Sequence, residues 1–333
     1  MLRHGIRSCR PLRLALAAVA LAVALAPASV LAGQLKVAVI KFGTVSWEMD
    51  VIRHHGLAAD QELELEVLAL ANTNASKVAL QAGEADVIVT DWIWVSRQRA
   101  EGADYTFVPY STALGSLMVP ADSPIKEIAD LKGRRLGIAG GPLDKSWLLL
   151  RGYGLERLGA DLDGEVDKVF AAAPLLNEQI QAGRLDAVIN YWPFAARLQA
   201  RGFRPLLGVN EMAESFGLVS RVPLLGYVFR ESQGEAQRDD IMAFLNATRE
   251  AKRIMSISDA EWERLRPKMR AKDDATFVAL RAGFRHGIPF HWRSEQRKDA
   301  AKLFAILAEQ GGEQLVGPSG ELAPGTFWPH FTY

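Results

Sequence analysis

The sequence predicts an α/β protein with two lobes, each a mostly parallel sheet flanked by helices, and three observations support this. Short apolar runs rich in β-branched residues alternate with segments of helical spacing along most of the chain. One stretch occurs twice, as QAGEADVIVTDW at residues 81–92 and as QAGRLDAVINYW at residues 181–192. From Gln237 onward the chain is almost wholly helical in its pattern. A duplicated unit and a strand-free tail together indicate two similar lobes and a helical extension.

Each copy of the repeat predicts a helix, a strand and a second helix. Its apolar centre, VIV in the first copy and AVI in the second, suits a strand buried on both faces. Glycines follow the helix before each strand, at Gly83 and Gly183, and a glycine is a common helix terminator. Strands joined by helices are typical of a parallel sheet, so two similar α/β lobes explain the repeat better than chance.

The first lobe is expected to alternate strands and helices. Its predicted strands are residues 35–40, 63–68, 87–89 and 105–108. Its predicted helices are residues 47–58, 76–82 and 92–100. An extended segment at residues 116–120 then leads through the turn Asp122-Ser123-Pro124 into the second lobe.

The second lobe repeats the pattern, and a helical tail follows it. Its predicted strands are residues 135–139, 166–170, 187–189 and 206–209, with helices at 145–158, 175–182 and 192–200. An extended piece at 227–230 precedes tail helices at 239–255, 259–269, 274–285 and 294–309. These amphipathic helices need an apolar partner, and the first lobe is the available one. We therefore expect lobe one at 33–115 and 221–333, lobe two at 116–220, and a hinge of two crossings beside a cleft.

Residues 1–32 are predicted to be a cleavable signal peptide. Four arginines (Arg3, Arg7, Arg10 and Arg13) precede an apolar run that is too short for a membrane span, and small residues end at Ala32. The single cysteine, Cys9, lies inside this leader, so no lipid-bearing cysteine and no disulfide is expected in the mature chain. This predicts a periplasmic protein that is not a lipoprotein.

Charge and motifs exclude several classes of function. The 39 basic and 39 acidic residues become 35 and 39 without the leader arginines, which indicates neither nucleic-acid nor anionic-membrane binding. Adjacent His54 and His55 should point in different directions on a helix, and no zinc-type spacing occurs. There is no GxGxxG, P-loop or GxSxG pattern. No catalytic residue, metal or cofactor is expected.

The chain resembles the type II periplasmic solute-binding proteins of ABC importers, in the branch that carries nitrate, taurine, alkanesulfonates and thiamine-type pyrimidines. The resemblance rests on the leader, the FGT after the first strand, HHGLAADQELELEVLAL, SPIKEIADLKGRRLGIAGG and the two repeats. It implies a two-lobed type II fold, no enzymatic activity, a small-molecule solute, an inner-membrane ABC permease as partner and a monomeric state. The pyrimidine-synthesising relatives depend on a cysteine-rich motif, which the mature chain lacks.

Two other functions remain open at this point. One is a periplasmic enzyme on the same fold. The other is a solute-binding module that serves signalling or a neighbouring dehydrogenase. Turnover of a bound compound would favour the enzyme, and the absence of neighbouring permease and ATPase genes would favour the module.

Candidate ligand-binding residues follow from the predicted topology. In open parallel sheets, ligands bind beyond the carboxyl ends of the strands, where loops and helix N-termini meet. The two repeats place TDW and NYW at matching points of opposite lobes. The candidates are Phe42, Gly43, Thr44, Trp47, Asn72, Asn74, Thr90, Asp91, Trp92, Gly140, Gly141, Asp144, Asn190, Tyr191 and Trp192.

Most candidates also have a purely structural explanation. Tryptophans that begin helices could pack beneath those helices as part of the core. Asp91, Asn72 and Asn74 could each serve simply as the N-cap of a helix. Gly140-Gly141 could be a simple turn, although it also frees N–H groups that suit an anionic group. Lys145 could be solvated or could pair with an anion.

The same residues lead to an expectation about the solute. Aromatic side chains from both lobes attract flat rings and cations. Asp91 would need a partner once lobe closure buries it, and no arginine occurs in the strand-end stretches. We therefore expect a small amine-bearing, zwitterionic or heteroaromatic organic solute rather than an inorganic anion.

Overall fold

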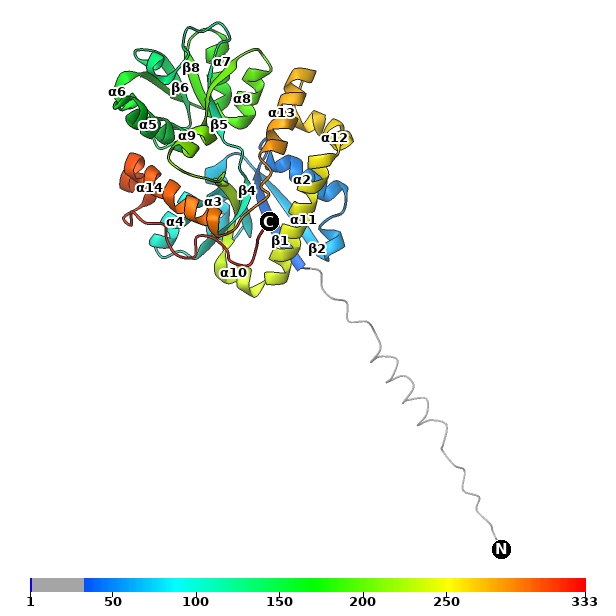
Figure 1. The fold of residues 1–333 in the computed structure, drawn as a ribbon. Helices are drawn as coiled ribbons and strands as arrows, with labels where there is room; N and C mark the ends of the chain where they lie inside the picture. The colour runs from blue at the N-terminus through cyan, green and yellow to red at the C-terminus, as the bar shows by residue number, and fades with distance from the viewer. Residues whose placement is uncertain (2–32) are drawn as a thin grey trace. The chain divides into compact units, whose positions relative to one another are not determined.

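A computed structural model describes Met1 and residues 33–333, and Gln34–Tyr333 form one compact unit (Figure 1). The predicted signal peptide lies outside the described residues, apart from Met1. Within the described part, no helix combines the length and the apolar character needed to cross a membrane. The predicted α/β class with two lobes is confirmed, because two five-stranded sheets form the framework of this unit.

The first sheet has the strand order β2-β1-β3-β10-β4. Its members are β1 (Gly33–Ile40), β2 (Leu63–Leu70), β3 (Val87–Asp91), β4 (Tyr105–Ser111) and β10 (Leu225–Arg230). β1 pairs in parallel with β3, with Val37 opposite Val87. β10 is antiparallel to both of its neighbours, with Tyr227 opposite Val89 on one side and Val108 on the other.

The second sheet has the order β7-β6-β8-β5-β9. Its members are β5 (Gly115–Val119), β6 (Arg135–Ala139), β7 (Asp167–Ala171), β8 (Ala187–Tyr191) and β9 (Arg204–Gly208). β6 is parallel to β7 and β8, whereas β5 is antiparallel to β8 and β9. Each sheet thus contains one antiparallel strand, β10 or β5, next to a crossing between the lobes. We call each sheet with its covering helices a lobe; the lobe boundaries at 115/116 and 220/221 stay a prediction.

Helices cover both sheets. They are α2 (Val45–His54), α3 (Thr73–Ala82), α4 (Trp92–Ala100), α5 (Lys145–Leu158), α6 (Leu162–Glu165), α7 (Ala173–Gln181), α8 (Trp192–Gln199), α9 (Val209–Ser215), α10 (Glu231–Ala236), α11 (Arg238–Ile257), α12 (Asp259–Met269), α13 (Asp274–His286) and α14 (Ser294–Val316), with short 3-10 turns at Ala59–Gln61 and Ile128–Leu131. The helix predicted at 47–58 ends early, at His54, because Gly56 turns the chain with φ +68°.

The two repeats have the predicted structure. Each strand, β3 or β8, passes directly into a helix, α4 or α8. The chain before each strand turns at a glycine with positive φ, +74° at Gly83 and +68° at Gly183. A residue with a side chain is strained in that conformation, which explains why both copies carry glycine there.

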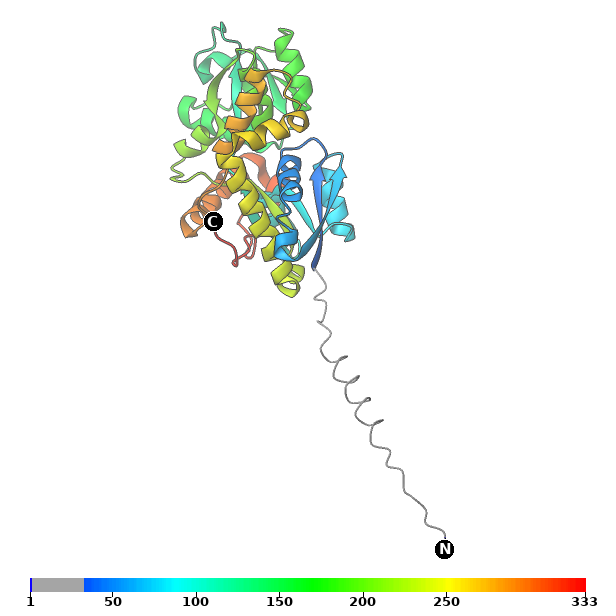
Figure 2. The ribbon, with the colours of Figure 1, turned by 90° about the vertical axis from the view of Figure 1, so that its right-hand side faces the viewer.

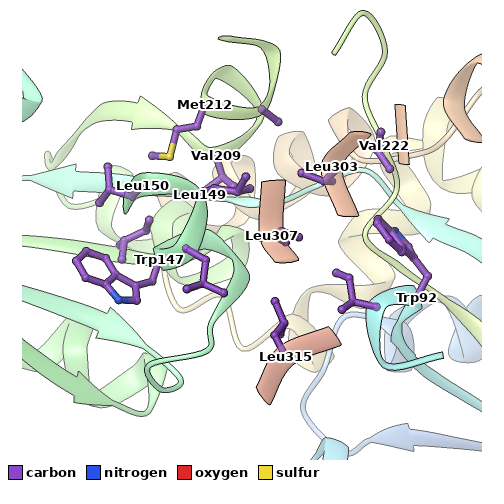
Figure 3. Close-up of a cluster of buried hydrophobic side chains, with 14 of the residues drawn as sticks. Trp92, Trp147, Leu149, Leu150, Val209, Met212, Val222, Leu303, Leu307 and Leu315 are labelled. Atoms are coloured by element: carbon purple, nitrogen blue, oxygen red, sulfur yellow. The ribbon is translucent and has the colours of Figure 1, made fainter. Parts of the chain in front are cut away.

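The tail helices do not pack on the first lobe alone, so that expectation is wrong. α11 packs against α2, but α13 packs against α8 of the second lobe (Figure 2). α14 contacts both α4 and α5. The physical reason is that α14 carries apolar side chains toward both lobes: Leu307 and Leu315 belong to the same buried cluster as Trp92 of α4 and Trp147 of α5 (Figure 3). One hydrophobic core therefore joins the two lobes.

Candidate functional site

A cavity of about 860 Å³ lies between the two sheets. On one side it is lined by the ends of β1 and β3 and by the first turns of α2 and α3. On the other side it is lined by the first turns of α5 and α8 and by α7 from Pro174 to Gln181, and the end of α12 closes part of the rim. This is the position that the topology predicts for a ligand site, beyond the carboxyl ends of strands.

Ten of the fifteen predicted site residues line this cavity. They are Phe42, Gly43, Thr44, Trp47, Asn74, Thr90, Asp91, Asp144, Tyr191 and Trp192. The structure places the other five outside the lining: Asn72, Trp92, Gly140, Gly141 and Asn190. Whether the ten contact a solute stays a prediction.

Three of the residues outside the lining have structural roles instead. Trp92 is fully buried, and its indole Nε1 donates to the Pro223 carbonyl at 3.0 Å. Asn72 caps α3 by accepting from the Ala75 N–H at 3.0 Å. Asn190 is buried, and its Nδ2 donates to the Ala173 carbonyl at 3.0 Å. These side chains hold the elements that carry the cavity.

Gly140, in the Gly140-Gly141 turn, lies next to Tyr191 and Asp144, which line the cavity. Gly140 has φ +88°, and a Cβ there would lie 2.8 Å from the Tyr191 hydroxyl oxygen. A glycine is therefore needed for the close approach of Tyr191 and for the positive φ. This supports the turn explanation for Gly140 and leaves the anion role without support from its contacts.

Asp91 and Lys145 form an ion pair between the two lobes. Asp91 caps α4 by accepting from the Trp94 N–H at 2.9 Å, and its other carboxylate oxygen lies 3.1 Å from Lys145 Nζ. Burial would raise the pKa of Asp91, but the nearby Lys145 and Lys77 outweigh it and hold the pKa below its ordinary value. Asp91 is thus an ionised cap that already has a cationic partner.

The second carboxylate in the lining, Asp144, also has partners. It caps α5 by accepting from the Ser146 N–H at 3.0 Å, and the Tyr191 hydroxyl donates to it at 3.0 Å. Burial raises the pKa of Asp144 despite the neighbouring Lys145, and burial together with Asp144 raises the pKa of Tyr191. Tyr191 therefore keeps its proton and ties β8 to the start of α5.

Aromatic rings from three helices meet at one end of the cavity. Trp47 of α2 lies edge-on to Trp192 of α8, with ring centroids 6.3 Å apart. Phe284 of α13 completes the group, 6.1 Å from Trp47 and 6.5 Å from Trp192. Trp47 is only 3% exposed, so it belongs mainly to the core and presents little surface to a solute. This packing joins α2 and α13 to α8.

Sequence reasoning missed several cations in the lining because they lie on the sides of helices rather than at strand ends. Lys77 stands on α3, one turn after Thr73 and Asn74, which also line the cavity. Arg197 and Arg201 follow Pro193 at intervals of four residues. Helical spacing from a predicted site residue could have found them, since positions three and four apart share a face. The cationic lining is Lys77, Lys145, Arg197, Arg201, Lys268 and Arg270.

Lys145 and Lys268 pair with carboxylates, those of Asp91 and Asp50, whereas Lys77 and Arg197 do not within the described part of the chain. Among residues 33–333, Lys77 forms no ion pair, and its ammonium lies 4.9 Å from the centroid of the Trp94 ring. Burial lowers the pKa of Lys77, and Asp91 opposes that shift. Arg197 donates to the Met269 carbonyl at 2.8 Å, so its charge also meets no carboxylate at hydrogen-bond distance within the described chain.

A family model described as NMT1/THI5 like matches residues 51–256, which is more than half of the 333-residue chain. The chain belongs to the NMT1/THI5-like family. Among curated proteins, none matches it. Membership agrees with the resemblance seen in the sequence, and the matched segment includes parts of both lobes.

Solved structures share the fold of this NMT1/THI5-like chain. The aliphatic sulphonate binding protein SsuA of Escherichia coli is similar, with a TM-score of 0.71, 19% identity, and coverage of 89% of this chain and 92% of that chain. The alkanesulfonate-binding protein SsuA of Xanthomonas axonopodis pv. citri, bound to MOPS, has a TM-score of 0.67 and 18% identity, and the match covers 89% of this chain and 98% of that chain. The desulfurization enzyme DSZB has a TM-score of 0.57 and 16% identity, and the match covers 88% of this chain and 97% of that chain. At these identities the similarity shows the fold, which binding proteins and an enzyme share.

Proposed function

We propose that this NMT1/THI5-like chain is the solute-binding component of an ABC import system and closes on a small organic solute with an anionic group. The sulfonate-binding proteins of the same fold support the transport role. The predicted signal peptide supports a periplasmic location, and an ABC permease is the partner that this role requires. We expect the protein to act as a monomer and not as an enzyme.

The charge of the cavity lining carries the proposal for an anionic group. Six cationic side chains line the cavity, against the two carboxylates of Asp91 and Asp144. Both carboxylates already have partners, Lys145 and Tyr191. Lys268 is also paired, with Asp50, and Lys268, Arg201 and Arg270 are exposed. Lys77 and Arg197 are half-buried without a carboxylate partner among the described residues, and an anion would balance their charge, which is costly to bury alone.

The expectation of an amine solute loses its main support. It rested on a buried carboxylate without a partner and on the absence of arginine from the strand-end stretches. The structure pairs Asp91 with Lys145 and brings Arg197 to the cavity from the side of α8. An isolated amine would add to the positive charge, whereas a zwitterion still suits the site.

Two further features support an organic solute. Apolar and aromatic side chains, including Tyr110, Trp192 and Phe194, line a large part of the cavity and would be poorly used by a bare inorganic anion. The Thr90 hydroxyl also lines the cavity, is buried, and has no hydrogen-bond partner among the described residues. A solute oxygen could accept from it, because buried hydroxyls normally find a partner.

Calorimetry with the mature protein tests the proposal. The panel contains taurine, aliphatic sulfonates, the matching carboxylates, pyrimidines, simple amines and nitrate. We expect an organic anion or zwitterion to bind, and Lys77→Met to weaken it at least about tenfold, since a charge-assisted hydrogen bond contributes roughly 1.5–3 kcal/mol. Lys298→Met, which changes an exposed lysine outside the cavity on α14, should leave the affinity unchanged. Tight binding of amines with no response to anions would overturn the anionic assignment.

A further inference from the structure

Two histidines and a glutamate come together outside the cavity lining. His54 is the last residue of α2, His55 follows it, and Glu261 lies in the first turn of α12. One ligand atom from each residue lies within 4.8 Å of those of the other two. The side chains therefore converge from two helices that are more than two hundred positions apart in sequence.

The end of α2 explains why the adjacent histidines converge. On a continuing helix their side chains would point about 100° apart. Here α2 ends at His54, His55 adopts φ −93° and ψ 0°, and Gly56 turns the chain with φ +68°. The two rings consequently lie edge to face with centroids 4.9 Å apart. The expectation that these rings point in different directions is therefore wrong.

Glu261 presents one carboxylate oxygen to the histidines. Its Oε1 accepts from Nε and a terminal nitrogen of Arg264, at 3.0 and 2.6 Å. Its Oε2 lies 3.1 Å from His55 Nε2. Burial would raise the pKa of Glu261, but hydrogen bonds from Arg264 and His55 outweigh burial and hold the pKa below its ordinary value. The carboxylate is therefore ionised at neutral pH and fixed in orientation.

The charge of Arg264 does not leave the cluster strongly positive. A second terminal nitrogen of Arg264 lies 2.5 Å from the Asp50 carboxylate, so Arg264 contacts two carboxylates. Asp50 is also paired with Arg53 and Lys268. Glu250 of α11 adds a further negative charge that interacts with His55. Arg264 then acts as an outer partner that orients the ligand oxygen, as hydrogen-bond donors do around many metal sites.

We propose that His54, His55 and Glu261 form a binding site for a first-row transition metal ion such as Zn²⁺, with water completing the coordination. Two imidazoles and one carboxylate are a ligand set that Zn²⁺ accepts. Ligand atoms about 2.1 Å from a tetrahedral ion lie about 3.4 Å apart, and the 3.1 Å between His55 Nε2 and Glu261 Oε2 is close to that spacing. The inference is independent of the solute proposed for the cavity.

Metal binding at this place would join α2 to α12. The beginning of α2, at Val45 and Trp47, and the end of α12, at Lys268 and Met269, both line the cavity. The cluster holds the opposite ends of the same two helices. An ion bound there would stabilise the first lobe on the side that carries these cavity residues.

Zinc titration of the full mature chain, without a histidine tag and after treatment with EDTA, tests the site. Calorimetry at pH 7.5 should show one saturable Zn²⁺ site. His54→Ala, His55→Ala and Glu261→Gln should each lower the affinity at least about tenfold. His291→Ala, which removes an exposed histidine outside the cluster, should leave it unchanged.

A second measurement keeps the test independent of folding. His54 is exposed, so His54→Gln should keep the EDTA-treated unfolding midpoint of the native chain while losing the stabilisation that Zn²⁺ adds. Absence of saturable Zn²⁺ binding by the native chain would overturn the proposal. So would binding by His54→Gln and His55→Ala that is as strong as binding by the native chain. Neither result affects solute binding, so this inference and the proposed function fail separately.

Discussion

Lys145 Nζ lies 3.1 Å from Asp91 Oδ2, and this contact joins the N-terminus of α5 in one lobe to the N-terminus of α4 in the other. The side chains are 24% and 11% exposed, respectively, so the pair is only partly screened by water. Arg197, which donates to the Met269 carbonyl, adds another polar link between the lobes. Polar contacts at the cavity therefore hold the lobes together, in addition to the hydrophobic core that includes the apolar side chains of α14.

Asp91→Asn should separate the contribution of the ion pair to stability from the contribution of the helix cap. Asparagine caps a helix about as well as aspartate, so the variant loses the pairing with Lys145 and keeps the cap. We expect a loss of about 1–3 kcal/mol in the free energy of unfolding at pH 7, measured with urea. Because the folded-state pKa of Asp91 is lowered, its contribution is present above the ordinary pKa of 3.8 and disappears as pH falls through the folded pKa. A difference that stayed constant down to pH 2 would contradict this assignment.

Lys252→Met should expose the cost of a buried carboxylate. Lys252 Nζ lies 2.8 Å from Glu48 Oε1, and both side chains are almost fully buried. Without the cation, Glu48 keeps the hydrogen bond from the Tyr227 hydroxyl but has no opposite charge beside it, and we expect a loss of about 3–5 kcal/mol at pH 7. Glu48→Gln combined with Lys252→Met should recover much of this loss in urea unfolding, because neither charge then remains.

The pH dependence of Lys252→Met gives a further check on the same pair. Burial already raises the pKa of Glu48 above its ordinary value of 4.5, and removal of Lys252 should raise it further. Between pH 4.5 and that higher pKa, the folded variant binds a proton that the unfolded chain does not bind. The variant should therefore become more stable as pH falls from 7 toward 5. If the variant instead lost stability as pH fell from 7 toward 5, Glu48 would not be the group responsible for the pH dependence.

Gly115→Ala should disturb the pairing of β5 with β8. A Cβ at Gly115 would lie 1.9 Å from the Asn190 carbonyl oxygen, which is backbone and cannot rotate away. We expect a loss of roughly 1–3 kcal/mol, and weaker solute binding because Gly115 also lines the cavity. Gly164→Ala is the matched control: no atom lies within 4 Å of its added Cβ, and its stability should change by less than about 1 kcal/mol. Equal effects of the two substitutions would reject the steric explanation.

Leu307→Ala should weaken the core that joins the lobes. Leu307 of α14 is fully buried in the cluster that also contains Trp92 and Trp147. Truncation of a buried leucine costs about 2–5 kcal/mol, depending on how far the cavity collapses. Leu155→Ala, at a position 40% exposed, should cost much less. Urea unfolding monitored by circular dichroism and by tryptophan fluorescence measures both variants, and similar losses would argue against a shared core at Leu307.

The repeats allowed most of the fold to be predicted from the sequence. The apolar runs and the terminating glycines at Gly83 and Gly183 are local signals, and β3, β8 and the helices that follow them form as those signals predict. The position of α14 is not a local property. Its Leu307 is apolar whichever lobe it contacts, so the sequence pattern cannot show that the helix packs between α4 and α5. The antiparallel direction of β10 and β5 likewise follows from the path of the chain between the lobes.

The candidate site was only partly predictable for a similar reason. Strand-end positions such as Asp91 and Tyr191 follow from the topology rule, and both line the cavity. The same rule also selected Trp92, although its ring turns into the core beneath α4. Lys77 and Arg197 reach the cavity because of how their helices are rotated against the sheets, and rotation is set by tertiary packing. Solute charge was therefore predicted from an incomplete set of side chains.

The antiparallel strand β10 also has a consequence for biosynthesis. The strands of the second sheet all lie within residues 115–208, so they become available together during translation. The first sheet lacks the strand between β3 and β4 until Leu225–Arg230 has been made. Until then, β3 and β4 have unpaired edges that can pair with other chains. A chain that ends near residue 220 should therefore hold all the strands of the second sheet and an incomplete, aggregation-prone first sheet.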